Sequence, residues 1–526
     1  MRTVVVCDAI HESGFELLRG EDDIHLIDAS KVNKDELLKT IKEADGVITR
    51  SSTDVDDKFL EAGSKLKAIV RAGVGVDNVD IDACSKKGVV LMNVPTANTI
   101  AAVELTMAHL LGVARSFPYA HNNLKQDRVW KREAWYGVEL NQKKLGVIGF
   151  GNIGSRVAIR AKAFGMDIIA YDPYIPSSKV TDLGMRYTKN FDDILACDFI
   201  TIHTPKNKET INMIDEEEIS KMKDGVRLVN CARGGLYNEK ALVKNLKSKK
   251  IAYLGIDVFD KEPATDHPFL DLDNVIVTPH LGANTLESQE KIATSAASQL
   301  IQALKGKSYP NALNLPLKLE DLPEFAPAYI ELTQKMANLG AQINKAPITN
   351  ITLEASGEIS EYIKPMLTFA LVGALSESLG DNLNYVNAKF IAKEKGIKTQ
   401  TKSLASSDYK NLIKVSIITE LETITINGTV FNEDEQRIVK INDFETDFKP
   451  SGKMIVFKNN DVPGVIMSIS SILAKENINI ADFRLGRNKN QNNALAVILV
   501  DNPIDKKIIK KLKELPTCLW ASYAVL

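Results

Sequence analysis

Three charged or titratable side chains follow three apolar runs in the middle of the chain. Arg233 comes after "LVNCA", Glu262 after "DVFDK" and His280 after "VIVTP". This set suits hydride transfer at a carbon that bears an oxygen, because a histidine can give or take the oxygen's proton near neutral pH. A nearby carboxylate favours the imidazolium, and a guanidinium can bind a carboxylate through two parallel hydrogen bonds. We therefore predict that His280 is the acid and base, that Glu262 tunes it, and that Arg233 holds a 2-oxo or 2-hydroxy acid.

Each of these residues has an ordinary explanation when it is taken alone. His280 follows a proline and suits a loop, Glu262 precedes Pro263 and suits a solvated turn, and Arg233 before two glycines suits a surface charge. Only the joint pattern, combined with a cofactor signature, favours catalysis.

That signature lies upstream, in "KLGVIGFGNIGSRVAIRAKAFG", which reads as a strand, a glycine-rich turn and a helix. Gly149 permits the tight turn, Gly151 lets the backbone approach a pyrophosphate, and Gly154 lets the helix pack on the strand. The following strand, "DIIAYD", ends in Asp172, whose carboxylate can accept hydrogen bonds from ribose hydroxyls and would repel a 2′-phosphate. We therefore expect NAD as the cofactor.

The elements that must position these residues are buried parallel strands. The runs "DFITIHTP", "GVRLVNCARGG", "AYLGIDVFDKEP" and "NVIVTPHLGA" are apolar without polar alternation, as strands covered on both faces are. Ligands bind at the carboxyl ends of such strands. His203, at the end of the first run, is predicted to lie beside the cofactor. The remaining histidines are predicted to be structural or solvated: His11, His25, His109, His121 and His267.

The segment in front of the glycine turn reads as a domain of its own. Five short apolar runs, "TVVVCD", "IHLID", "DGVITR", "LKAIVRAG" and "GVVLMNVP", alternate with helix-compatible segments before residue 97. This order predicts an α/β domain that is complete before the nucleotide-binding segment begins.

These residues resemble a known family. "VNCARGG", "DVFDKEP" and "TPHLGA", joined to "GFGNIG", are similar to the D-isomer-specific 2-hydroxyacid dehydrogenases, whose catalytic Arg, Glu and His match Arg233, Glu262 and His280. The stretch from "VRAGVGVDNVDIDAC" to "AAVELTMAHLL" and the long C-terminal extension resemble the long-type D-3-phosphoglycerate dehydrogenase family. The resemblance implies NAD-dependent oxidation of 3-phospho-D-glycerate to 3-phosphohydroxypyruvate, the first step of phosphorylated L-serine biosynthesis, and the reverse reduction.

The resemblance also implies an α/β architecture in four parts. A Rossmann-type NAD-binding domain (98–283) is inserted in a flavodoxin-like substrate-binding domain (1–97 with 284–315). An α/β intervening domain (316–446) and a ferredoxin-like ACT regulatory domain of βαββαβ order (452–526) follow. The helices "ANTIAAVELTMAHLLGVARS" and the one after "HLGANT" are expected to cross between the first two domains.

The family's contacts can be carried over to matching positions. Arg50 and Arg71 end strands and match arginines near substrate carboxylate and phosphate, while Arg132 matches an arginine that reaches a neighbouring subunit. The resemblance places the substrate against Arg50, Arg71, Gly75, Asn98, Arg132, Arg233 and His280. It places the cofactor against Val74, Gly149, Gly151, Asn152, Ile153, Gly154, Asp172, His203, Thr204, Pro205, Cys231, Ala232, Arg233, Asp257, His280, Gly282 and Ala283.

The C-terminal third carries no catalytic set. After a proline-marked linker, "NLPLKLEDLPEFAP", the NG of "ITINGTVF" predicts a two-residue hairpin turn. The later loop "NNDVPGV" resembles the ligand loop of ACT domains, which bind amino acids between paired modules. The resemblance implies L-serine as an allosteric effector, held by Asn459, Asp461 and Asn479.

Composition limits the remaining classes of function. The 526 residues exceed one core and suit about three or four domains. A net charge of -2 with 44% hydrophobic and 25% charged residues favours neither a nucleic-acid nor a membrane partner. Five scattered cysteines predict neither disulfides nor a metal site. Without an apolar signal segment we expect a cytoplasmic protein, and the resemblance implies a homo-oligomer, a dimer or a homotetramer.

Two alternatives stay open at this point. One is a dehydrogenase for another D-2-hydroxy acid, such as glycerate or glyoxylate, although the C-terminal extension disfavours it. The other is a non-catalytic NAD-sensing scaffold, which can keep the same three residues and which the ACT-like segment disfavours.

Overall fold

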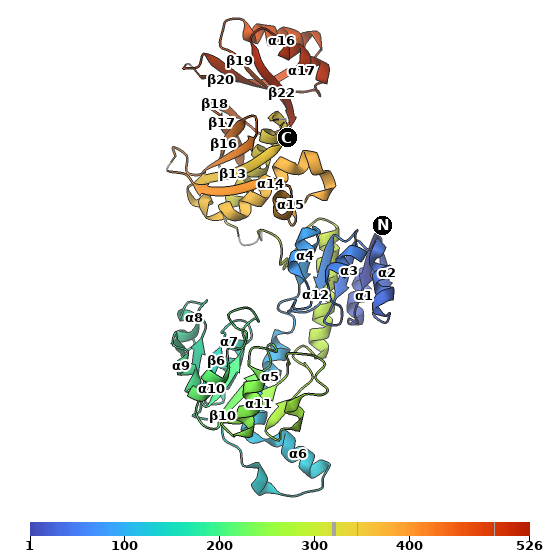
Figure 1. Ribbon diagram of the computed structural model, residues 1–526, viewed down its shortest axis with the longest axis vertical. Coiled ribbons are helices and arrows are strands. Elements are labelled where there is room, and N and C mark those ends of the chain that lie inside the picture. The colour runs from blue at the N-terminus through green and yellow to red at the C-terminus, as the bar shows by residue number, and fades with distance from the viewer. Residues whose placement is uncertain (318–321, 345, 406, 489) are drawn as a thin grey trace.

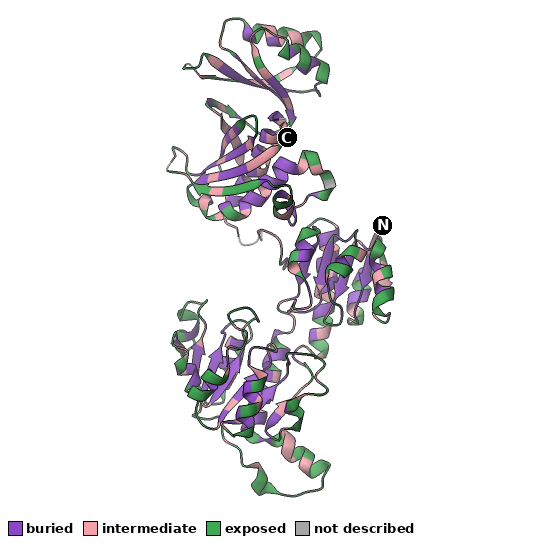
Figure 2. Ribbon diagram, viewed as in Figure 1, coloured by how far each residue is buried: buried purple, intermediate pink, exposed green. Residues whose placement is uncertain are grey.

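Four β-sheets follow one another along the long axis of the molecule (Figure 1). The computed structural model describes residues 1–317, 322–344, 346–405, 407–488 and 490–526, so part of the predicted linker, 318–321, lies outside the described residues. Buried residues concentrate in the strands of each sheet (Figure 2). The sheet that is second in the sequence lies at one end of the molecule, next to the N-terminal sheet and furthest from the C-terminal one.

The N-terminal sheet contains five parallel strands in the order β2-β1-β3-β4-β5. These are the five predicted apolar runs. Strands β3, β4 and β5 are almost fully buried, as strands with both faces covered are, whereas the edge strand β2 has no buried residue. The strands are β1 (Arg2–Val6), β2 (Ile24–Asp28), β3 (Gly46–Thr49), β4 (Ala68–Arg71) and β5 (Val90–Asn93), and the helices between them are α1 (Glu12–Arg19), α2 (Lys34–Thr40), η1 (Ile41–Glu43), α3 (Asp57–Ala62) and α4 (Ile81–Lys86).

The second sheet is the predicted parallel sheet, with seven strands in the order β12-β11-β10-β9-β6-β7-β8. The order reverses between β6 and β9, where a doubly wound sheet binds its ligand. The strands are β6 (Lys144–Ile148), β7 (Asp167–Tyr171), β8 (Arg186–Thr188), β9 (Phe199–Ile202), β10 (Val226–Asn230), β11 (Ile251–Ile256) and β12 (Val275–Val277). The helical segments are α6 (Phe117–Lys125), η2 (Arg132–Trp135), α7 (Gly154–Ala163), α8 (Ser178–Thr181), α9 (Asp192–Leu195), α10 (Glu216–Lys221), α11 (Glu239–Lys247) and η3 (Pro268–Asp271).

Two long helices make the predicted crossings between these sheets. Helix α5 (Thr99–Arg115) enters the nucleotide-binding side, where it packs on β10 and β11. Helix α12 (Leu286–Leu304) returns and packs on β3, β4 and α1. Ile292, Ala296 and Leu300 of α12 join the core formed by the first strands. The N-terminal sheet is therefore completed by a helix from much later in the chain.

The third sheet has six strands in the order β14-β13-β15-β16-β17-β18, with only β13 and β14 parallel. Helices α13 and α14 pack together and cover it. The strands are β13 (Ile348–Ser356), β14 (Lys398–Ser403), β15 (Leu412–Thr419), β16 (Thr423–Phe431), β17 (Glu435–Ile441) and β18 (Phe444–Phe448), and the helices are α13 (Ala326–Ile343), η5 (Glu358–Tyr362), α14 (Ile363–Leu379), η6 (Gly380–Asn382) and α15 (Ala388–Glu394).

The hairpin turn predicted at Asn427 and Gly428 is wrong. Both residues lie inside the continuous strand β16, where the register with β17 shifts by a bulge. A Cβ at Gly428 would lie 3.1 Å from a Leu332 methyl group and would collide with the Met336 sulfur, both on α13. The glycine therefore allows close helix packing, which is its other common role within strands.

The C-terminal segment has the predicted βαββαβ order. Its strands are antiparallel in the order β20-β21-β19-β22. One face of this sheet is covered by the two helices of the segment, and the other face packs on α13 of the preceding domain. The elements are β19 (Lys453–Asn460), α16 (Val465–Lys475), β20 (Ile480–Asn488), β21 (Asn493–Val500), α17 (Lys506–Lys513) and β22 (Cys518–Val525).

A small contact joins the third domain to the first. The Asn384 side chain donates a hydrogen bond to the Gly88 carbonyl at 2.8 Å, and Val386 inserts into the apolar core of the N-terminal domain. Among the described residues, no single helix combines the length and apolar composition needed to cross a bilayer; α5 and α6 reach that length only together, across a 73° bend.

Candidate active site

A cavity of about 480 Å³ lies between the carboxyl ends of the first two sheets. Strands β3 and β4 reach it from one side, and β9, β10 and β12 from the other. Most of the predicted contacts line this one cavity: Arg50, Arg71, Val74, Gly75, Asn98, Ile153, His203, Thr204, Pro205, Cys231, Ala232, Arg233, His280, Gly282 and Ala283.

His280 and Glu262 form the predicted acid/base pair. His280 Nδ1 lies 2.7 Å from Glu262 Oε2, while Glu262 Oε1 accepts a hydrogen bond from the Phe259 N–H at 3.0 Å. Burial opposes ionisation of Glu262, but the hydrogen bonds from His280 and Phe259 and the nearby Arg233 charge outweigh it and lower the pKa of the carboxyl. Glu262 is thus held ionised behind the ring, which leaves His280 Nε2 free of this contact.

Three guanidinium groups converge on the same cavity. Burial lowers the pKa of Arg71 to about 10, with further repulsion from Arg233 and Arg50. Arg233 Nε lies 3.3 Å from Asp77 Oδ2, and Arg71 Nε is buried without a hydrogen-bond partner among the described residues. A buried cluster of like charges is costly unless an anion completes it. The cavity therefore suits a substrate with more than one negative charge.

Two glycines make room for these side chains. A Cβ at Gly73, which has φ +151, would collide with an Arg71 terminal nitrogen, and a Cβ at Gly75 would collide with one of Arg233. The "RAGVGV" turn after β4 therefore lets two arginines fold over its backbone.

Besides Arg71 Nε, two polar atoms in the cavity wall lack partners among the described residues. Asn98 Oδ1 and Thr204 Oγ1 are buried and make no hydrogen bond in the described structure. Asn98 begins helix α5 without using its side chain as a cap, and Thr204 follows β9. Such atoms need a partner to offset their desolvation, which supports a bound ligand here.

The glycine-rich turn fits a dinucleotide. A Cβ at Gly149, which has φ +83, would lie 2.6 Å from the His203 carbonyl oxygen, and a Cβ at Gly154 would collide with the Gly149 carbonyl. Space around Gly151 is open to at least 4 Å. The first and third glycines thus permit the turn and the helix packing, and the second leaves room for a pyrophosphate.

Asp172 lies at the end of β7 with a fixed carboxylate. Its Oδ2 accepts the Phe150 N–H at 2.8 Å and its Oδ1 accepts the Tyr174 N–H at 3.0 Å. The acidic group is therefore tied to the glycine-rich turn, as ribose recognition requires, and the following "PYIPSS" offers no arginine for a 2′-phosphate. This geometry favours NAD over NADP.

Family models match three segments of the chain. The D-isomer specific 2-hydroxyacid dehydrogenase, NAD binding domain, matches residues 107–282. The D-3-phosphoglycerate dehydrogenase intervening domain matches 326–442, and the AHAS small subunit-like ACT domain matches 455–519.

Curated relatives match the chain over almost its full length. D-3-phosphoglycerate dehydrogenase of Methanocaldococcus jannaschii is 38% identical over 519 residues, which is 98% of each chain. The protein of the same name from Bacillus subtilis is 36% identical over 98% of each chain. The chain belongs to the D-3-phosphoglycerate dehydrogenase family. As a member of this family it is an NAD-dependent oxidoreductase, and the predicted fold class, with its Rossmann and ACT domains, is confirmed.

A solved structure matches the first two domains. D-lactate dehydrogenase from Aquifex aeolicus, complexed with NAD and lactic acid, is 32% identical with a TM-score of 0.52. The match covers 58% of this chain and 96% of that one. This shorter dehydrogenase thus shares the fold of part of this chain, and the intervening and ACT family models match the later segments 326–442 and 455–519.

Some predicted residues of this family member lie behind or away from the cavity. Asp257 is 0% exposed and lies under the loop that carries His280. Its backbone carbonyl accepts a hydrogen bond from the His280 N–H at 2.9 Å. Arg132 lies on the exposed segment η2, which contacts α6, and it does not line the cavity. Neither residue lines the cavity of its own chain, so neither is placed to touch a ligand bound there.

Among the lining residues that sequence reasoning missed, two are charged, Asp77 and Lys206. Lys206 directly follows the "HTP" that comes after β9, so its place three residues beyond His203 was a usable signal. Asp77 follows a flexible-looking "GVGV" and had no such signal; only the fold brings it to Arg233.

The predicted effector residues do not all meet. Asn459 and Asp461 line a cavity of about 390 Å³ under the first turn of α16. The Asn459 side chain is buried, and its Oδ1 has no hydrogen-bond partner among the residues that the structure describes. Asp461 Oδ2 accepts from Arg487 Nε at 2.7 Å. Asn479 lies outside this cavity and donates to Asp501 at 2.7 Å. Within one chain, two of the three predicted residues share a site.

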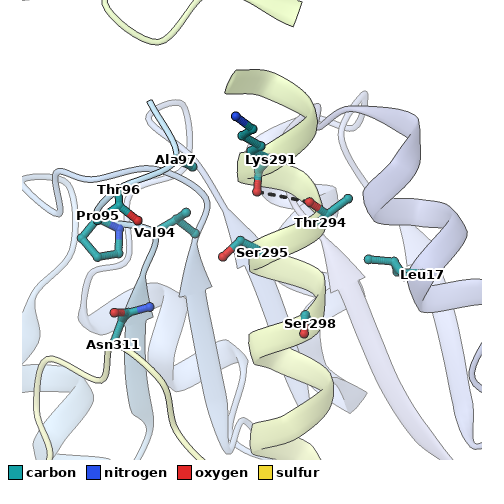
Figure 3. A pocket seen from close by; sticks show the side chains of 10 residues that line it. All are labelled: Leu17, Val94, Pro95, Thr96, Ala97, Lys291, Thr294, Ser295, Ser298 and Asn311. Atoms are coloured by element: carbon teal, nitrogen blue, oxygen red, sulfur yellow. Dashed lines mark hydrogen bonds between the residues drawn. The ribbon is translucent and has the colours of Figure 1, made fainter. Parts of the chain in front are cut away.

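A further cavity of about 500 Å³ lies on the N-terminal domain, between α12 and the segment that follows β5 (Figure 3). Its polar lining is modest: Thr294 donates its hydroxyl to the Lys291 carbonyl, and Ser295 and Ser298 face the same space. None of the predicted catalytic, cofactor or effector residues lines it.

Proposed function

We propose that this chain catalyses the NAD-dependent oxidation of 3-phospho-D-glycerate to 3-phosphohydroxypyruvate, and the reverse reduction, as the first step of phosphorylated L-serine biosynthesis. One observation carries the proposal. Arg50, Arg71 and Arg233 surround the same cavity that His280 lines, so one site offers an acid/base beside charge for two anionic groups.

The acid/base role falls to His280. With Nδ1 bonded to Glu262, Nε2 takes the hydroxyl proton during oxidation and returns it during reduction. Glu262, held ionised, stabilises the imidazolium that forms. NAD, when bound, supplies the hydride acceptor.

Arg233 is proposed to hold the substrate carboxylate next to the carbon that reacts. Its Nη1 donates to the Ala232 carbonyl at 2.7 Å and its Nε faces Asp77, so the guanidinium has a defined direction. A guanidinium so oriented binds a carboxylate bidentately. Arg50 and Arg71, on the opposite wall, are then available for the phosphate, with Gly75 and Asn98 beside the substrate.

We propose that the cofactor is held by the residues predicted from the sequence, which include the glycine-rich turn and residues before and after it in the chain. The cavity-lining members of that set, such as Val74, Thr204 and Cys231, would contact the nicotinamide half. Asp257 is proposed to act through the loop above it, since it is buried beneath that loop.

The four predicted domains are proposed as functional units with the boundaries 1–97 with 284–315, 98–283, 316–446 and 452–526; one sheet lies in each. We also propose a dimer or tetramer in which Arg132 reaches a neighbouring site. Exposed aromatic residues near Arg132, Trp130 and Tyr136, support such a contact. All five cysteines are free, which suits the reducing cytoplasm.

L-serine is proposed as the allosteric effector of the C-terminal domain. Asn459 and Asp461 offer an amide oxygen and a carboxylate for its ammonium group. Asn479 is proposed to contribute from a second, paired module. Calorimetry on the full chain with L-serine at millimolar concentration should detect binding that Asp461→Ala abolishes. Absence of binding to the unmodified chain would end the proposal.

The catalytic proposal is tested by NADH consumption with 3-phosphohydroxypyruvate and, separately, with unphosphorylated hydroxypyruvate. We expect a strong preference for the phosphorylated acid, and a fall of at least about 100-fold in kcat for His280→Ala. Equal or reversed preference would assign another 2-hydroxy acid to the enzyme. No turnover with any acid would favour the NAD-sensing scaffold.

A further inference from the structure

His109 is a buried histidine with no part in the reaction described so far. It lies in the middle of α5 and is 3% exposed. Its Nε2 lies 2.9 Å from Thr278 Oγ1, whereas its Nδ1 is buried and has no hydrogen-bond partner in the described part of the chain. A Cβ at Gly255 of β11 would lie 2.9 Å from that Nδ1, so the glycine allows the strand to approach the ring closely.

The direction of the hydrogen bonds follows from the acceptors. Thr278 Oγ1 donates its only proton to Asp257 Oδ1 at 2.6 Å. The same oxygen must therefore accept from His109, which places the ring proton on Nε2. Burial supports the neutral ring, because it lowers the pKa of His109 to about 4. A directed chain runs from His109 through Thr278 to Asp257.

Asp257 uses this chain to hold the backbone around His280. Its carboxylate accepts the Leu281 N–H at 2.7 Å and the Gly282 N–H at 2.9 Å, and its carbonyl accepts the His280 N–H at 2.9 Å. His280 has φ +54, in the left-handed region that is unfavourable for a histidine. Such a conformation persists only when its surroundings enforce it.

We propose that His109 and Thr278 are positioning residues, which orient the Asp257 carboxylate and thereby the loop that presents His280 to the substrate. The inference rests on the proposed function, because it assigns these residues to the same reaction. Helix α5 directly follows Asn98 in the cavity wall, so these hydrogen bonds also tie the crossing helix to the catalytic loop.

The test compares paired variants of the full chain. Thr278→Val and His109→Leu remove the hydroxyl and the ring donor, whereas Thr278→Ser and His109→Gln keep a donor in place. Thr333→Val is the matched control, because it removes a buried hydroxyl of α13 that donates to the Tyr329 carbonyl of the same helix, in a domain that does not line the cavity. Turnover of 3-phosphohydroxypyruvate with NADH is measured together with hydrogen exchange of the segment 278–284.

Thr278→Val and His109→Leu should each lower kcat about tenfold, with KM changed less than about threefold, because misplaced catalytic groups affect the transition state more than binding. Thr278→Ser, His109→Gln and Thr333→Val should stay within about threefold of the unmodified kcat. The double variant should be no slower than either single variant, since both break one chain. Exchange at Leu281 and Gly282 should accelerate only in the variants that lose the donor.

Unchanged kcat and unchanged exchange in Thr278→Val would overturn the inference. So would multiplicative losses in the double variant, or a serine variant as slow as the valine one. The proposed function fails separately, if the unmodified chain does not turn over. In that case the exchange measurement still decides whether His109 and Thr278 hold the loop.

Discussion

At the scale of single residues, the arginines of the cavity show a conflict between stability and binding. Of Arg50, Arg71 and Arg233, only Arg233 has an ion pair in the described part of the chain. Arg71 is crowded by the other two, and its Nε has no partner. A buried guanidinium that lacks an ion-pair partner lowers the stability of the folded chain, and such a residue is retained where it binds a ligand.

Replacing Arg71 with methionine should therefore separate its effect on the stability of the fold from its effect on substrate binding. We expect Arg71→Met to stabilise the ligand-free chain by about 1–2 kcal/mol, because repulsion and desolvation are relieved. The KM for 3-phosphohydroxypyruvate should rise by at least about 100-fold, since a charged hydrogen bond to phosphate is lost. Calorimetric unfolding and steady-state kinetics measure the two quantities.

Arg227→Met is a suitable control for that prediction. Arg227 is a half-buried arginine of β10, away from the cavity, which donates to the Val113 carbonyl at 3.0 Å and lies over two aromatic rings. Its loss should destabilise the chain and leave KM unchanged. A destabilised Arg71→Met variant would contradict our account of the arginine cluster.

The neutral state of His109 predicts a loss of stability in acid. Burial lowers the pKa of His109 from 6.5 to about 4, so below pH 6.5 the unfolded chain binds a proton that the folded chain does not. Stability therefore falls as pH decreases from 6.5 towards 4, by about 3 kcal/mol for this one group. Calorimetry between pH 7 and pH 5 should show a shallower decline for His109→Leu than for the unmodified chain.

His25→Leu provides the comparison, because it replaces an exposed histidine of β2 by the same residue. Parallel curves for the unmodified chain and His109→Leu would show that His109 is protonated in the folded state.

Residue roles could be predicted from sequence where strand ends carried them. Arg50, Arg71, Arg233 and His280 end or follow parallel strands, and the sheet brings such positions to one edge. His109 could not be recognised in this way, since a lone histidine on an apolar helix gives no sign of what lies opposite. Its partner Thr278 is far along the chain and meets it only because α5 packs on β11.

At the scale of elements, Gly151 and Gly154 of the glycine-rich turn differ in the space that surrounds them. A Cβ at Gly154 would collide with the Gly149 carbonyl, whereas Gly151 has open space around it. Gly154→Ala should therefore force α7 away from β6 and lower the unfolding temperature of the nucleotide-binding domain. Gly151→Ala should unfold at nearly the same temperature as the unmodified chain, yet bind NADH at least about tenfold more weakly, because the methyl group occupies the pyrophosphate's approach.

NADH fluorescence titration and calorimetry on both variants check this prediction. Equal NADH affinity for Gly151→Ala and the unmodified chain would show that the pyrophosphate does not lie against Gly151.

Element order and type were predictable because buried strands leave apolar runs and glycines mark turns. The failure at Asn427 and Gly428 shows the limit of such signals. Asn-Gly usually makes a hairpin turn, but here β16 continues through it, and the glycine serves the contact with Met336 of α13. A tertiary contact overrode a local preference, and the local sequence does not contain that contact.

At the scale of the whole molecule, the link between the intervening domain and the N-terminal domain is small. Val386 is 6% exposed within the N-terminal core, and Asn384 bonds to the Gly88 carbonyl. The sequence predicted the domains on both sides of this contact but gave no sign of it, because surface complementarity leaves no periodic pattern.

Val386→Asp should open this contact, because it would bury an unpaired carboxylate. We expect a larger radius of gyration in small-angle scattering, kcat within about twofold of the unmodified value, and loss of the proposed serine response. Leu421→Asp, at a turn residue that is 83% exposed, should change none of these. Unchanged scattering for Val386→Asp would mean that the domains are held together elsewhere.

The return of α12 to the N-terminal sheet has a consequence for synthesis on the ribosome. Strand β5 ends at Asn93, and α12, which supplies Ile292, Ala296 and Leu300 to the same core, begins at Leu286. At ~5–20 residues per second, roughly 10–40 s pass between the emergence of the strands and that of their covering helix. During translation one face of the first sheet is therefore exposed while the entire nucleotide-binding domain is made. The first domain of the chain to be synthesised is thus not the first that can finish folding.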